Sequence, residues 1–563
     1  MRPGSGAWVG SVGAVLGGLL LWVNLPGAPR PLGGLSALFA LVPLLLLCRQ
    51  PSARRAFWHS YLLLAIYYLC ADSWLWLHFP LVYPFKAAGS AAVALVGVWL
   101  IRRLARSLPL PIAAGLGWAA GEWLRAHLPE LPYPHHQLAH SLYDRSWFLG
   151  SASLWGEVGL NFLAAACSGA LAGLWSAWRE ARPPFRRGLV WGGTILLLLG
   201  GNALLSHGLL AAVESFPGPE VGLVQGNRPV TRLASVRSPT GDFESYLHLT
   251  RRLCREQDFD LVAWPESTLP LPVLRGFGER RPVDMAGRVH GSPAELARAE
   301  ALFFRRVAGA CRLRPGGGVV LGGSLGRPEA GDPGLLRVAN AGFLLNTQGR
   351  LQGWVVKRNL VPGGEFLPLL RRLPFGLGLA LERWGSRHGI PVLAPGGGPR
   401  TVLRPRTGRF GVAICYDNAF QDFFAAAVRE GAGWHLVISN EAWYGEGAEL
   451  DQMVAMTALY AAATRRSILR CTNSGISCLV SPRGKIGPVL RREGRDREVA
   501  GTLAVRVPLA RGETPLSRIS GWPGLAVLLV SFLLALRRRG GPRRWDDSGE
   551  TAPAPGKGGP GTD

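Results

Sequence analysis

The sequence predicts a two-part protein: a polytopic α-helical membrane domain of about eight transmembrane helices, and an α/β domain with a sheet core. Three observations predict this fold class. Apolar segments follow one another through residues 7–209. Strand-like and helix-like segments alternate from Glu220 onward, as in α/β domains. The chain has 563 residues, 48% of them hydrophobic, which is too long for one ordinary domain.

Seven apolar segments come first, and an eighth lies near the C-terminus. Several are about 20 residues long, the length that crosses the ~30 Å hydrocarbon core of a bilayer. The first runs into Leu25-Pro26 without a clear small-residue cleavage site, which favours a span over a cleaved signal. The predicted spans are 7–24, 34–48, 56–78, 89–104, 109–124, 155–178, 188–209 and 520–536.

The basic charge of the chain indicates membrane topology. The net charge is +25, almost all from arginine, and no motif typical of nucleic-acid binding accompanies it. Alternate loops are arginine-rich, which by the positive-inside rule places both termini in the cytoplasm and residues 210–519 on the periplasmic side. The arginine-rich side holds residues 2, 49, 54, 55, 102, 103, 106, 179, 182, 186, 187 and 537–544, whereas the other carries only Arg30, Lys86, Arg125 and Arg145.

These patterns give the domain boundaries. We expect a membrane domain over 1–212, a periplasmic α/β domain over 213–512, the eighth helix over 513–539 and a disordered cytoplasmic tail over 540–563. The eight cysteines show no CxxC or Cys/His spacing and no disulfide pattern, so we expect no metal and no cofactor.

The α/β domain is expected to carry chemistry at the carboxyl ends of its strands, where sites gather in such sheets. Glu266 follows the strand-like segment 260–264, and Cys415 follows the one at 410–414. The other strand-like segments are 221–225, 318–324, 340–346, 434–439, 468–473 and 477–480, and the helix-like ones are 241–257, 293–313, 419–430 and 450–466.

Cys415 is the first candidate for chemistry. It stands between a strand and a helix that Asp417 and Asn418 begin, and the N-terminus of a helix lowers the pKa of a thiol. The alternative is a buried structural cysteine, which is the commoner role of a lone Cys in an apolar run.

Two further residues oppose that alternative. Pro265 ends its strand and presents the carboxylate of Glu266, although a solvated loop Glu is the usual case. Lys357 follows Val355-Val356 in a chain that contains only four lysines. A lysine kept where arginine is used almost everywhere else suggests that a compact, tunable donor is needed there.

The loop 125–154 contains Leu131-Pro-Tyr-Pro-His-His-Gln-Leu-Ala-His140. Loops rich in Pro and aromatic residues often lie in the lipid headgroup region. A role in facing the substrate is the alternative.

Several stretches, in order along the chain, together resemble a known family. They are Glu122-Trp-Leu-Arg125, Leu223-Val-Gln-Gly-Asn227, Trp264-Pro-Glu266, Lys357-Arg-Asn-Leu-Val-Pro362 with Glu365, Ile414-Cys-Tyr416, Ile438-Ser-Asn-Glu-Ala-Trp-Tyr-Gly445 and Arg470-Cys-Thr-Asn-Ser-Gly475. With the apolar spans around them, they resemble the nitrilase, or carbon–nitrogen hydrolase, superfamily. More closely, they resemble its membrane-embedded branch, the apolipoprotein N-acyltransferases.

The resemblance implies a nitrilase-like α-β-β-α sandwich for the α/β domain. It implies Glu266 as general base, Lys357 as stabiliser of the oxyanion and Cys415 as nucleophile, with Glu365 as a second carboxylate beside them. The supporting or substrate-binding positions that it implies are Tyr416, Asp417, Asn340, Trp443, Asn440 and Gln225.

The resemblance also implies the reaction. Cys415 takes an acyl chain from a membrane phospholipid as a thioester, and the α-amine of the N-terminal S-diacylglyceryl cysteine of an apolipoprotein then receives it. We expect a monomer in the bacterial inner membrane that binds no nucleic acid. The alternatives are a membrane-bound nitrilase-type amidase, an N-acyltransferase acting on another amine, or a non-catalytic lipoprotein-binding paralogue. Neither Gly316-Gly-Gly318 nor Gly396-Gly-Gly398 has the lysine and serine of a phosphate loop.

The chain departs from the family pattern at three places. Asp417 replaces the usual Glu two residues after the nucleophile, Gln452-Met453 replaces a Gln-His pair, and Tyr460-Ala-Ala-Ala463 lacks the glutamate of an Arg-Ala-x-Glu pattern. These positions bear on how the acceptor is held and not on the three catalytic candidates.

Overall fold

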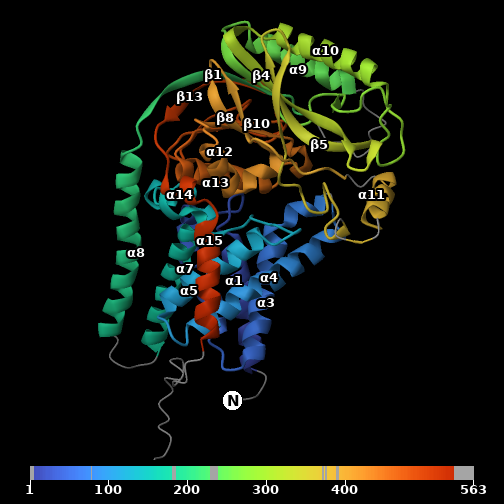
Figure 1. Ribbon diagram of the computed structural model, residues 1–563. Helices are drawn as coiled ribbons and strands as arrows, with labels where there is room; N and C mark the ends of the chain where they lie inside the picture. Colours follow the sequence, from blue (N-terminus) through green and yellow to red (C-terminus); the bar gives the residue numbers. More distant parts are fainter. Residues whose placement is uncertain are drawn as a thin grey trace, which may run out of the picture.

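The computed structural model describes residues 5–77, 79–179, 185–228, 239–370, 373–374, 377–388 and 392–537. The chain folds into a helical bundle with a sheet domain seated on one end of it (Figure 1). The last helix, α15, returns from the sheet domain and packs beside α5 in the bundle. The predicted tail 540–563 lies outside the described residues.

The bundle has a helix at each of the eight predicted apolar segments. The long helices are α1 Ser5–Trp22, α3 Ala53–Ala71, α4 Val82–Leu104, α5 Leu110–Ala126, α7 Ala152–Arg179, α8 Phe185–Ala211 and α15 Trp522–Leu536. The short ones are η1 Pro31–Phe39, α2 Val42–Cys48, η2 Ser73–Leu77, η3 Leu138–Leu142 and α6 Ser146–Leu149. The segment 34–48 is therefore divided between a 3-10 helix and a short α-helix.

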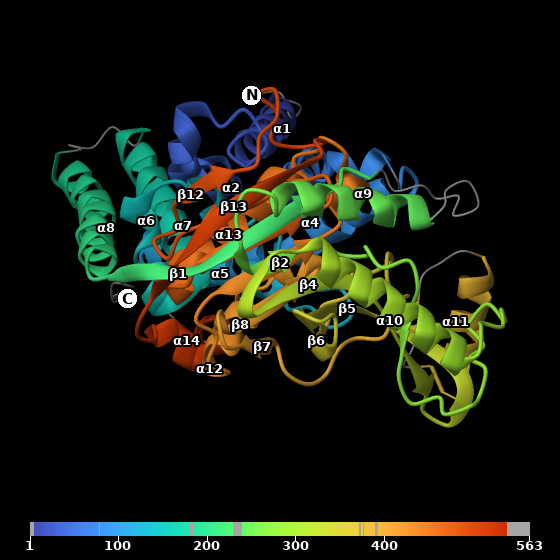
Figure 2. The ribbon, with the colours of Figure 1, turned by 90° about the horizontal axis from the view of Figure 1, so that it is seen from above.

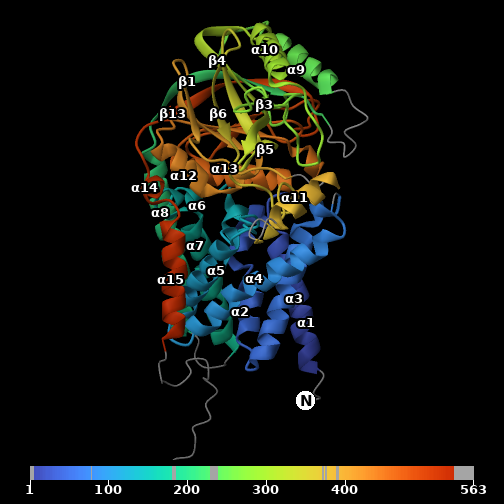
Figure 3. The ribbon, with the colours of Figure 1, turned by 45° about the vertical axis from the view of Figure 1, so that its right-hand side comes forward.

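Four helical stretches of the described residues are long and apolar enough to cross a membrane: Pro31–Cys48, Val82–Leu104, Ala152–Trp178 and Leu189–Ala211. Gly10–Trp22 and Trp522–Leu536 are apolar but shorter. The expected count of eight is not confirmed. The stretch in α7 is 72% buried and that in α8 only 11%, so α7 is central and α8 lies at the edge of the bundle (Figure 1). Figure 3 shows the bundle from another side, with α15 along one flank.

The sheet domain contains two sheets. The first has the strand order β13-β1-β2-β4-β5-β6, with β3 also paired to β4, and the second has the order β12-β11-β10-β9-β8-β7. The first comprises β1 Ser215–Gln225, β2 Phe259–Ala263, β3 Val273–Leu274, β4 Leu313–Glu329, β5 Asp332–Asn346, β6 Leu351–Val356 and β13 Gly501–Ala510. The second comprises β7 Thr401–Arg404, β8 Gly408–Ile414, β9 His435–Ser439, β10 Ile468–Thr472, β11 Cys478–Val480 and β12 Ile486–Val489.

Helices cover the outer face of each sheet. On the first sheet lie α9 Pro239–Leu253 and α10 Pro293–Ala310, which form the outermost layer of the molecule (Figure 2). On the second lie α12 Gln421–Arg429 and α13 Glu449–Thr464, between the sheet and the bundle. The inner faces meet in one core that includes Leu223 and Val320 of the first sheet with Val412 and Ile438 of the second. This layer order is the predicted α-β-β-α sandwich. Two smaller helices are α11 Leu377–Arg387 and α14 Pro515–Ile519.

The packing of the central strands explains why their sequences are continuous apolar runs. β8, β9 and β10 are parallel neighbours, and β2 is parallel to both β1 and β4. Parallel strands that are covered on both faces need apolar side chains on both faces. Their sequences therefore lack the alternation of apolar and polar residues that is typical of half-exposed strands. Their carboxyl ends lie together, which sets the position of the candidate site.

Candidate active site

Cys415 lies at the turn that follows β8. It has φ 50°, a left-handed conformation, and it begins the 3-10 helix η5 Cys415–Ala419. Asp417 fixes this turn, because its carboxylate accepts hydrogen bonds from the backbone N–H of Ile414 (3.2 Å) and of Asn359 (2.8 Å). The turn is thereby tied to the segment that follows Lys357.

Glu266 follows β2 and lies beside the same turn. Its carboxylate accepts hydrogen bonds from the backbone N–H of Asn440 (2.9 Å) and from the side-chain amide of Asn340 (2.9 Å). It also lies near enough to the Cys415 thiol for the two groups to affect each other's pKa. Gly322 of β4 lets this segment approach closely, because a Cβ there would lie 2.5 Å from the Cα of Glu266. The general-base candidate is thus held beside the nucleophile candidate.

Lys357 follows β6, and its side chain is fully buried. Its Nζ lies 2.7 Å from Glu365 Oε1 and 3.6 Å from Glu266 Oε1. The amide of Asn340 donates to both carboxylates, to Glu266 and, at 3.0 Å, to Glu365. One ammonium and one amide therefore stabilise two neighbouring carboxylates, of which Glu266 is buried and Glu365 partly exposed, and which would otherwise repel each other.

The electrostatics of this cluster define its resting protonation. Burial raises the pKa of the Cys415 thiol, and the neighbouring Glu266 carboxylate raises it further, against the lowering effect of Lys357. The sequence-based expectation of a lowered thiol pKa is wrong here, because burial outweighs the effect of the helix start. Burial also raises the pKa of Glu266, which makes this carboxylate a better proton acceptor.

Lys357 remains charged in the buried site. Burial alone would lower the pKa of its ammonium, but the negative charges of a Cys415 thiolate, Glu365 and Glu266 raise that pKa well above its usual value. A fixed positive charge therefore lies beside the sulfur, in a region that excludes water.

The predicted supporting residues fall into two groups. Glu365, Asn340, Asp417 and the backbone of Asn440 lie around the three catalytic candidates, as described above. The side chains of two others make contacts outside this cluster: Tyr416 donates from its hydroxyl to the carbonyl of Pro132 (2.8 Å), and Gln225 donates to the carbonyl of Val499 (2.9 Å). Trp443 lies in η6 Glu441–Tyr444, which follows Asn440.

Gln225 is fully buried between the two sheets. Its amide oxygen accepts hydrogen bonds from the hydroxyls of Thr472 and Ser477 on the second sheet. Its position favours a supporting role between the sheets over contact with substrate.

The central part of the loop between α5 and α7 is buried inside the protein. Residues 134–142 are buried against the sheet domain. Arg125 of α5 fixes the start of the loop by donating hydrogen bonds to the carbonyls of Tyr133 and His135. His135 contacts Glu449 of α13 at 2.6 Å. The loop thus joins the bundle to the segment that carries the nucleophile candidate.

A partly buried ion pair that sequence reasoning missed contacts this loop. Lys86 of α4 pairs with Asp72, which also accepts a hydrogen bond from the Tyr133 hydroxyl at 2.6 Å. The structure places Lys86 within the candidate span Val82–Leu104, whereas the predicted span began at residue 89 and left Lys86 in a loop. An ionisable residue inside such a span is a candidate for a functional role. The partner of Lys86 was not apparent from the sequence.

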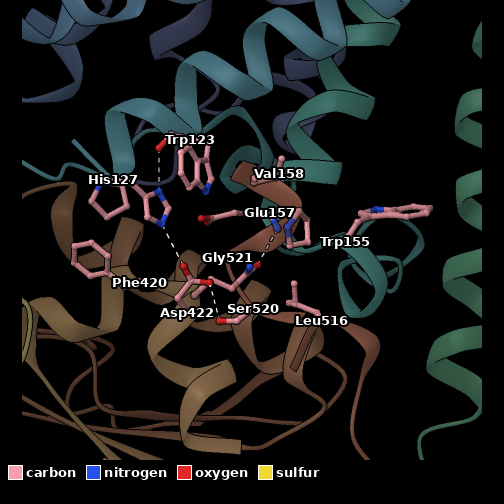
Figure 4. Close-up of a pocket in the computed structure, with 14 residues that line it drawn as sticks. Trp123, His127, Trp155, Glu157, Val158, Phe420, Asp422, Leu516, Ser520 and Gly521 are labelled. Carbon is pink, nitrogen blue, oxygen red and sulfur yellow. Dashed lines mark hydrogen bonds and ion pairs between the residues drawn. The ribbon is translucent and has the colours of Figure 1, made fainter. Parts of the chain in front are cut away.

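A small cavity lies where the end of α15 meets the junction of the two parts (Figure 4). At its wall, Asp422 contacts His127 Nε2 (3.2 Å) and accepts a hydrogen bond from the Ser520 hydroxyl (3.2 Å). None of its lining residues belongs to the Glu266–Lys357–Cys415 cluster. The cavity is therefore distinct from the candidate catalytic centre.

Comparison with known proteins accounts for both parts of the chain. Residues 220–512 match the carbon–nitrogen hydrolase family, and residues 17–170 match the apolipoprotein N-acyltransferase N-terminal domain. An apolipoprotein N-acyltransferase of Geobacter metallireducens is 26% identical over 93% of this chain and 95% of its own length. That of Azotobacter vinelandii is 28% identical over 96% of each chain.

Among solved structures, a Saccharomyces cerevisiae member of branch 10 of the nitrilase superfamily is 19% identical, with a TM-score of 0.33 over 54% of this chain and 94% of its own. The family match extends over more than half of the chain and contains Glu266, Lys357 and Cys415. The chain therefore belongs to the carbon–nitrogen hydrolase family, and it joins that domain to the N-terminal domain of the apolipoprotein N-acyltransferases.

Proposed function

We propose that this protein is an apolipoprotein N-acyltransferase. It transfers an acyl chain from a membrane phospholipid to the α-amine of the N-terminal S-diacylglyceryl cysteine of an apolipoprotein, through a thioester on Cys415. The observation that carries the proposal is the convergence of Cys415, Glu266 and a fully buried Lys357 in a chain with candidate membrane spans. Both substrates are lipids, so a catalytic domain joined to membrane helices suits them.

The first half-reaction forms the thioester. Glu266 takes the proton from Cys415, and the thiolate attacks the ester carbonyl carbon of the phospholipid. The Lys357 ammonium stabilises the oxyanion of the tetrahedral intermediate, in a low-dielectric site where such an interaction is strongest. The carbon–oxygen bond then breaks, and the proton on Glu266 passes to the leaving alkoxide of the lysophospholipid.

The second half-reaction transfers the acyl group. The neutral α-amine of the acceptor attacks the thioester carbonyl, and Glu266 accepts a proton from the attacking nitrogen. The carbon–sulfur bond breaks, an amide forms, and the released thiolate recovers the proton from Glu266. The buried position of the centre favours the amine over water, because it limits hydrolysis of the thioester.

The membrane arrangement that we propose follows the arginine distribution. Eight helices span the inner membrane, both termini are cytoplasmic, and the sheet domain lies on the periplasmic side. The helix found at every predicted segment supports the proposal, although only four meet the length and composition expected of a span.

The three departures from the family pattern lie on one side of the site. The backbone carbonyl of Met453 accepts a hydrogen bond from Asn418 (3.1 Å), and Tyr460 donates to the carbonyl of Ala419 (2.9 Å). These contacts hold η5 against α13. They support a role for these positions in shaping the turn that carries Cys415.

The test uses the full-length enzyme in detergent or nanodiscs. It receives a phospholipid labelled in its acyl chain and an S-diacylglyceryl lipopeptide with a free α-amine. We expect labelled amide on that amine, no product with the N-acetylated lipopeptide, and none from Cys415→Ala. Release of labelled fatty acid in place of the amide would identify a hydrolase and reject the proposal. Complementation of a cell depleted of its own apolipoprotein N-acyltransferase tests the same function in vivo.

A further inference from the structure

A second site lies away from the catalytic centre, against the end of α8 that leads into the sheet domain. It is a groove of about 920 Å³. One wall is the end of α8, from His207 to Ala211, the second is the segment 143–149 that contains α6, and the third is the turn 481–486 between β11 and β12. None of its lining residues belongs to the Glu266–Lys357–Cys415 cluster.

The groove lies beside the end of a candidate membrane span. α8 exposes Leu196, Leu197 and Leu204 by 75% or more, so lipid would cover its outer face. The candidate span in α8 ends at Ala211, and the chain enters the sheet domain at Ser215, both of which line the groove. Figure 1 shows α8 beside the bundle with its upper end joined to β1.

The groove also contains aromatic side chains. Tyr143 and Trp147 line the groove, and both residue types prefer the boundary between headgroups and hydrocarbon. Leu149 and Leu210 lie with them and supply apolar surface for the first carbons of a lipid chain. The walls therefore offer an interfacial environment for the glycerol region of a phospholipid and an apolar one for its acyl chains.

The turn between β11 and β12 supplies positive charge. Gly484 has φ 76°, and a Cβ there would lie 2.8 Å from the carbonyl oxygen of Ala458, so the turn is packed tightly onto α13. Arg483 and Lys485, on either side of Gly484, are exposed and line the groove. Arg483 also donates to the carbonyl of Val213 at 2.9 Å, which joins the turn to the end of α8.

The negative charge in the groove is compensated. Asp144, the carboxylate residue among those that line it, pairs with Arg30 at 2.9 Å. Lys485 forms no ion pair with any carboxylate in the described part of the chain. The groove therefore has a net positive charge at its polar end, which is complementary to a phosphate.

We propose that this groove binds one phospholipid from the leaflet on the side of the sheet domain, as a bound lipid that is not the acyl donor. The phosphate lies near Arg483 and Lys485, the glycerol lies beside Tyr143 and Trp147, and the acyl chains follow the apolar face of α8. The lipid fills the space between α8 and the sheet domain.

The experiment reconstitutes the full chain in nanodiscs with a phospholipid that carries a diazirine near the glycerol end of one acyl chain. After illumination, mass spectrometry maps the adducts. We expect adducts on peptides containing 143–149, 207–213 and 481–486. Diacylglycerol with the same photoreactive chain should give several-fold fewer, because it lacks the phosphate. Adding inorganic phosphate should leave the labelling in place, since the groove binds the chains as well as the anion.

Two variants test the charges. Arg483→Glu with Lys485→Glu should reduce these adducts about tenfold, because basic residues near a lipid surface attract anionic groups. The charge-matched control, Arg251→Glu with Arg298→Glu on α9 and α10 at the far end of the molecule, should leave them unchanged. Lys485→Ala, an exposed truncation, provides the test if the double variant does not fold.

Three results would overturn the proposal. They are adducts spread evenly over the outer faces of the bundle, equal labelling by diacylglycerol, and undiminished labelling of the Glu variants. Cys415→Ala should keep the adducts, because it lacks the nucleophile but retains the groove. A failure of the proposed acyl transfer is therefore distinguishable from a failure of this site.

Discussion

His135 Nε2 lies 2.6 Å from Glu449 Oε1, and both side chains are almost fully buried. The contact joins the loop between α5 and α7 to α13 of the sheet domain. The His135 ring also stacks on Tyr416, with centroids 5.6 Å apart and planes inclined by 15°. Because Tyr416 follows Cys415 directly, the loop of the bundle supports the turn that holds the proposed nucleophile.

Removing this support should slow the first half-reaction. Burial lowers the pKa of His135 to about 3, so its ring is neutral and acts through packing and one N–H. We expect His135→Ala to lower the single-turnover rate of acyl-enzyme formation by about tenfold to a hundredfold, the scale on which small misplacements act. His135→Phe keeps the ring stack and should recover part of that rate, whereas His135→Gln keeps only a hydrogen-bond donor.

A melting curve of each variant separates positioning from folding. The control is His248→Ala, an exposed histidine on α9. A loss of rate that follows the melting temperature alone, with no recovery in His135→Phe, would mean that His135 has only a structural role.

Cys415 should be essential. Cys415→Ala should form no acyl-enzyme, and Cys415→Ser almost none, because a serine hydroxyl is far harder to ionise than a thiol. The measurement is a hydroxylamine-sensitive label from acyl-labelled phospholipid without acceptor. Cys70→Ser and Cys311→Ser, at half-buried cysteines elsewhere in the chain, are the matched controls and should label normally. An undiminished label in Cys415→Ala would eliminate Cys415 as the nucleophile.

The pH dependence should report Glu266. Glu266 must be ionised to accept the thiol proton, and burial raises its pKa above the ordinary value of 4.5. The rate of acyl-enzyme formation should therefore rise with pH as Glu266 loses its proton, and fall as pH drops through that raised pKa. Single-turnover rates from acid to neutral pH measure the profile, and Glu266→Gln should abolish the rate. A wild-type rate that is flat across this range would argue against Glu266 as the base.

The topology of the chain can be read with reporter fusions. A fusion near residue 300, in α10, should behave as periplasmic, and one after Arg544 as cytoplasmic, because arginine-rich loops stay inside. Fusions in the loop after each helix decide whether all eight helices span. A cytoplasmic signal at residue 300 would contradict both the count and the proposed access to lipoproteins.

Structural features that depend only on a local sequence pattern could be predicted from the sequence. Apolar runs of about 20 residues and strands ending in Pro265-Glu266 or in Cys415 are visible in the chain itself. The edge strands β7 and β13 were missed for different reasons. β7 has only four residues, which is too short for a clear pattern. β13 does alternate, with Leu503, Val505, Val507 and Leu509 facing the core between the sheets, so its period of two could have been recognised in the sequence. The contact of His135 with Glu449 joins residues 314 positions apart and leaves no local signal.

The pKa of Cys415 could not be predicted for a related reason. Its value depends on burial by neighbouring elements, whereas the sequence shows only the start of a helix. Asp417, one methylene shorter than the residue the family pattern has at this position, was unexplained in the sequence. In the fold its carboxylate reaches the backbone N–H groups of Ile414 and Asn359, so a short side chain suffices there.

Lys357 gives the sharpest test of the proposed chemistry. If its ammonium stabilises the oxyanion, Lys357→Arg should lose as much activity as Lys357→Ala, about 10²–10³-fold in the rate of acyl-enzyme formation. A guanidinium keeps the charge but is planar and larger, and the fully buried site, with Glu365 at 2.7 Å, leaves no room to place one N–H at the same point. Lys357→Met, of similar reach without charge, should be equally slow.

The control for Lys357 is the reverse exchange at the next residue. The Arg358 side chain donates to the carbonyl of Gly398 and not to the Glu266 or Glu365 carboxylate. Arg358→Lys keeps the charge at this position, so it should retain the wild-type rate of acyl-enzyme formation. Labelled phospholipid without acceptor isolates the first half-reaction from acceptor binding, and a melting curve confirms folding. If Lys357→Arg forms acyl-enzyme at near the wild-type rate, the positive charge acts from a distance and Lys357 is not the oxyanion donor. The stabilisation would then have to come from another donor beside Cys415.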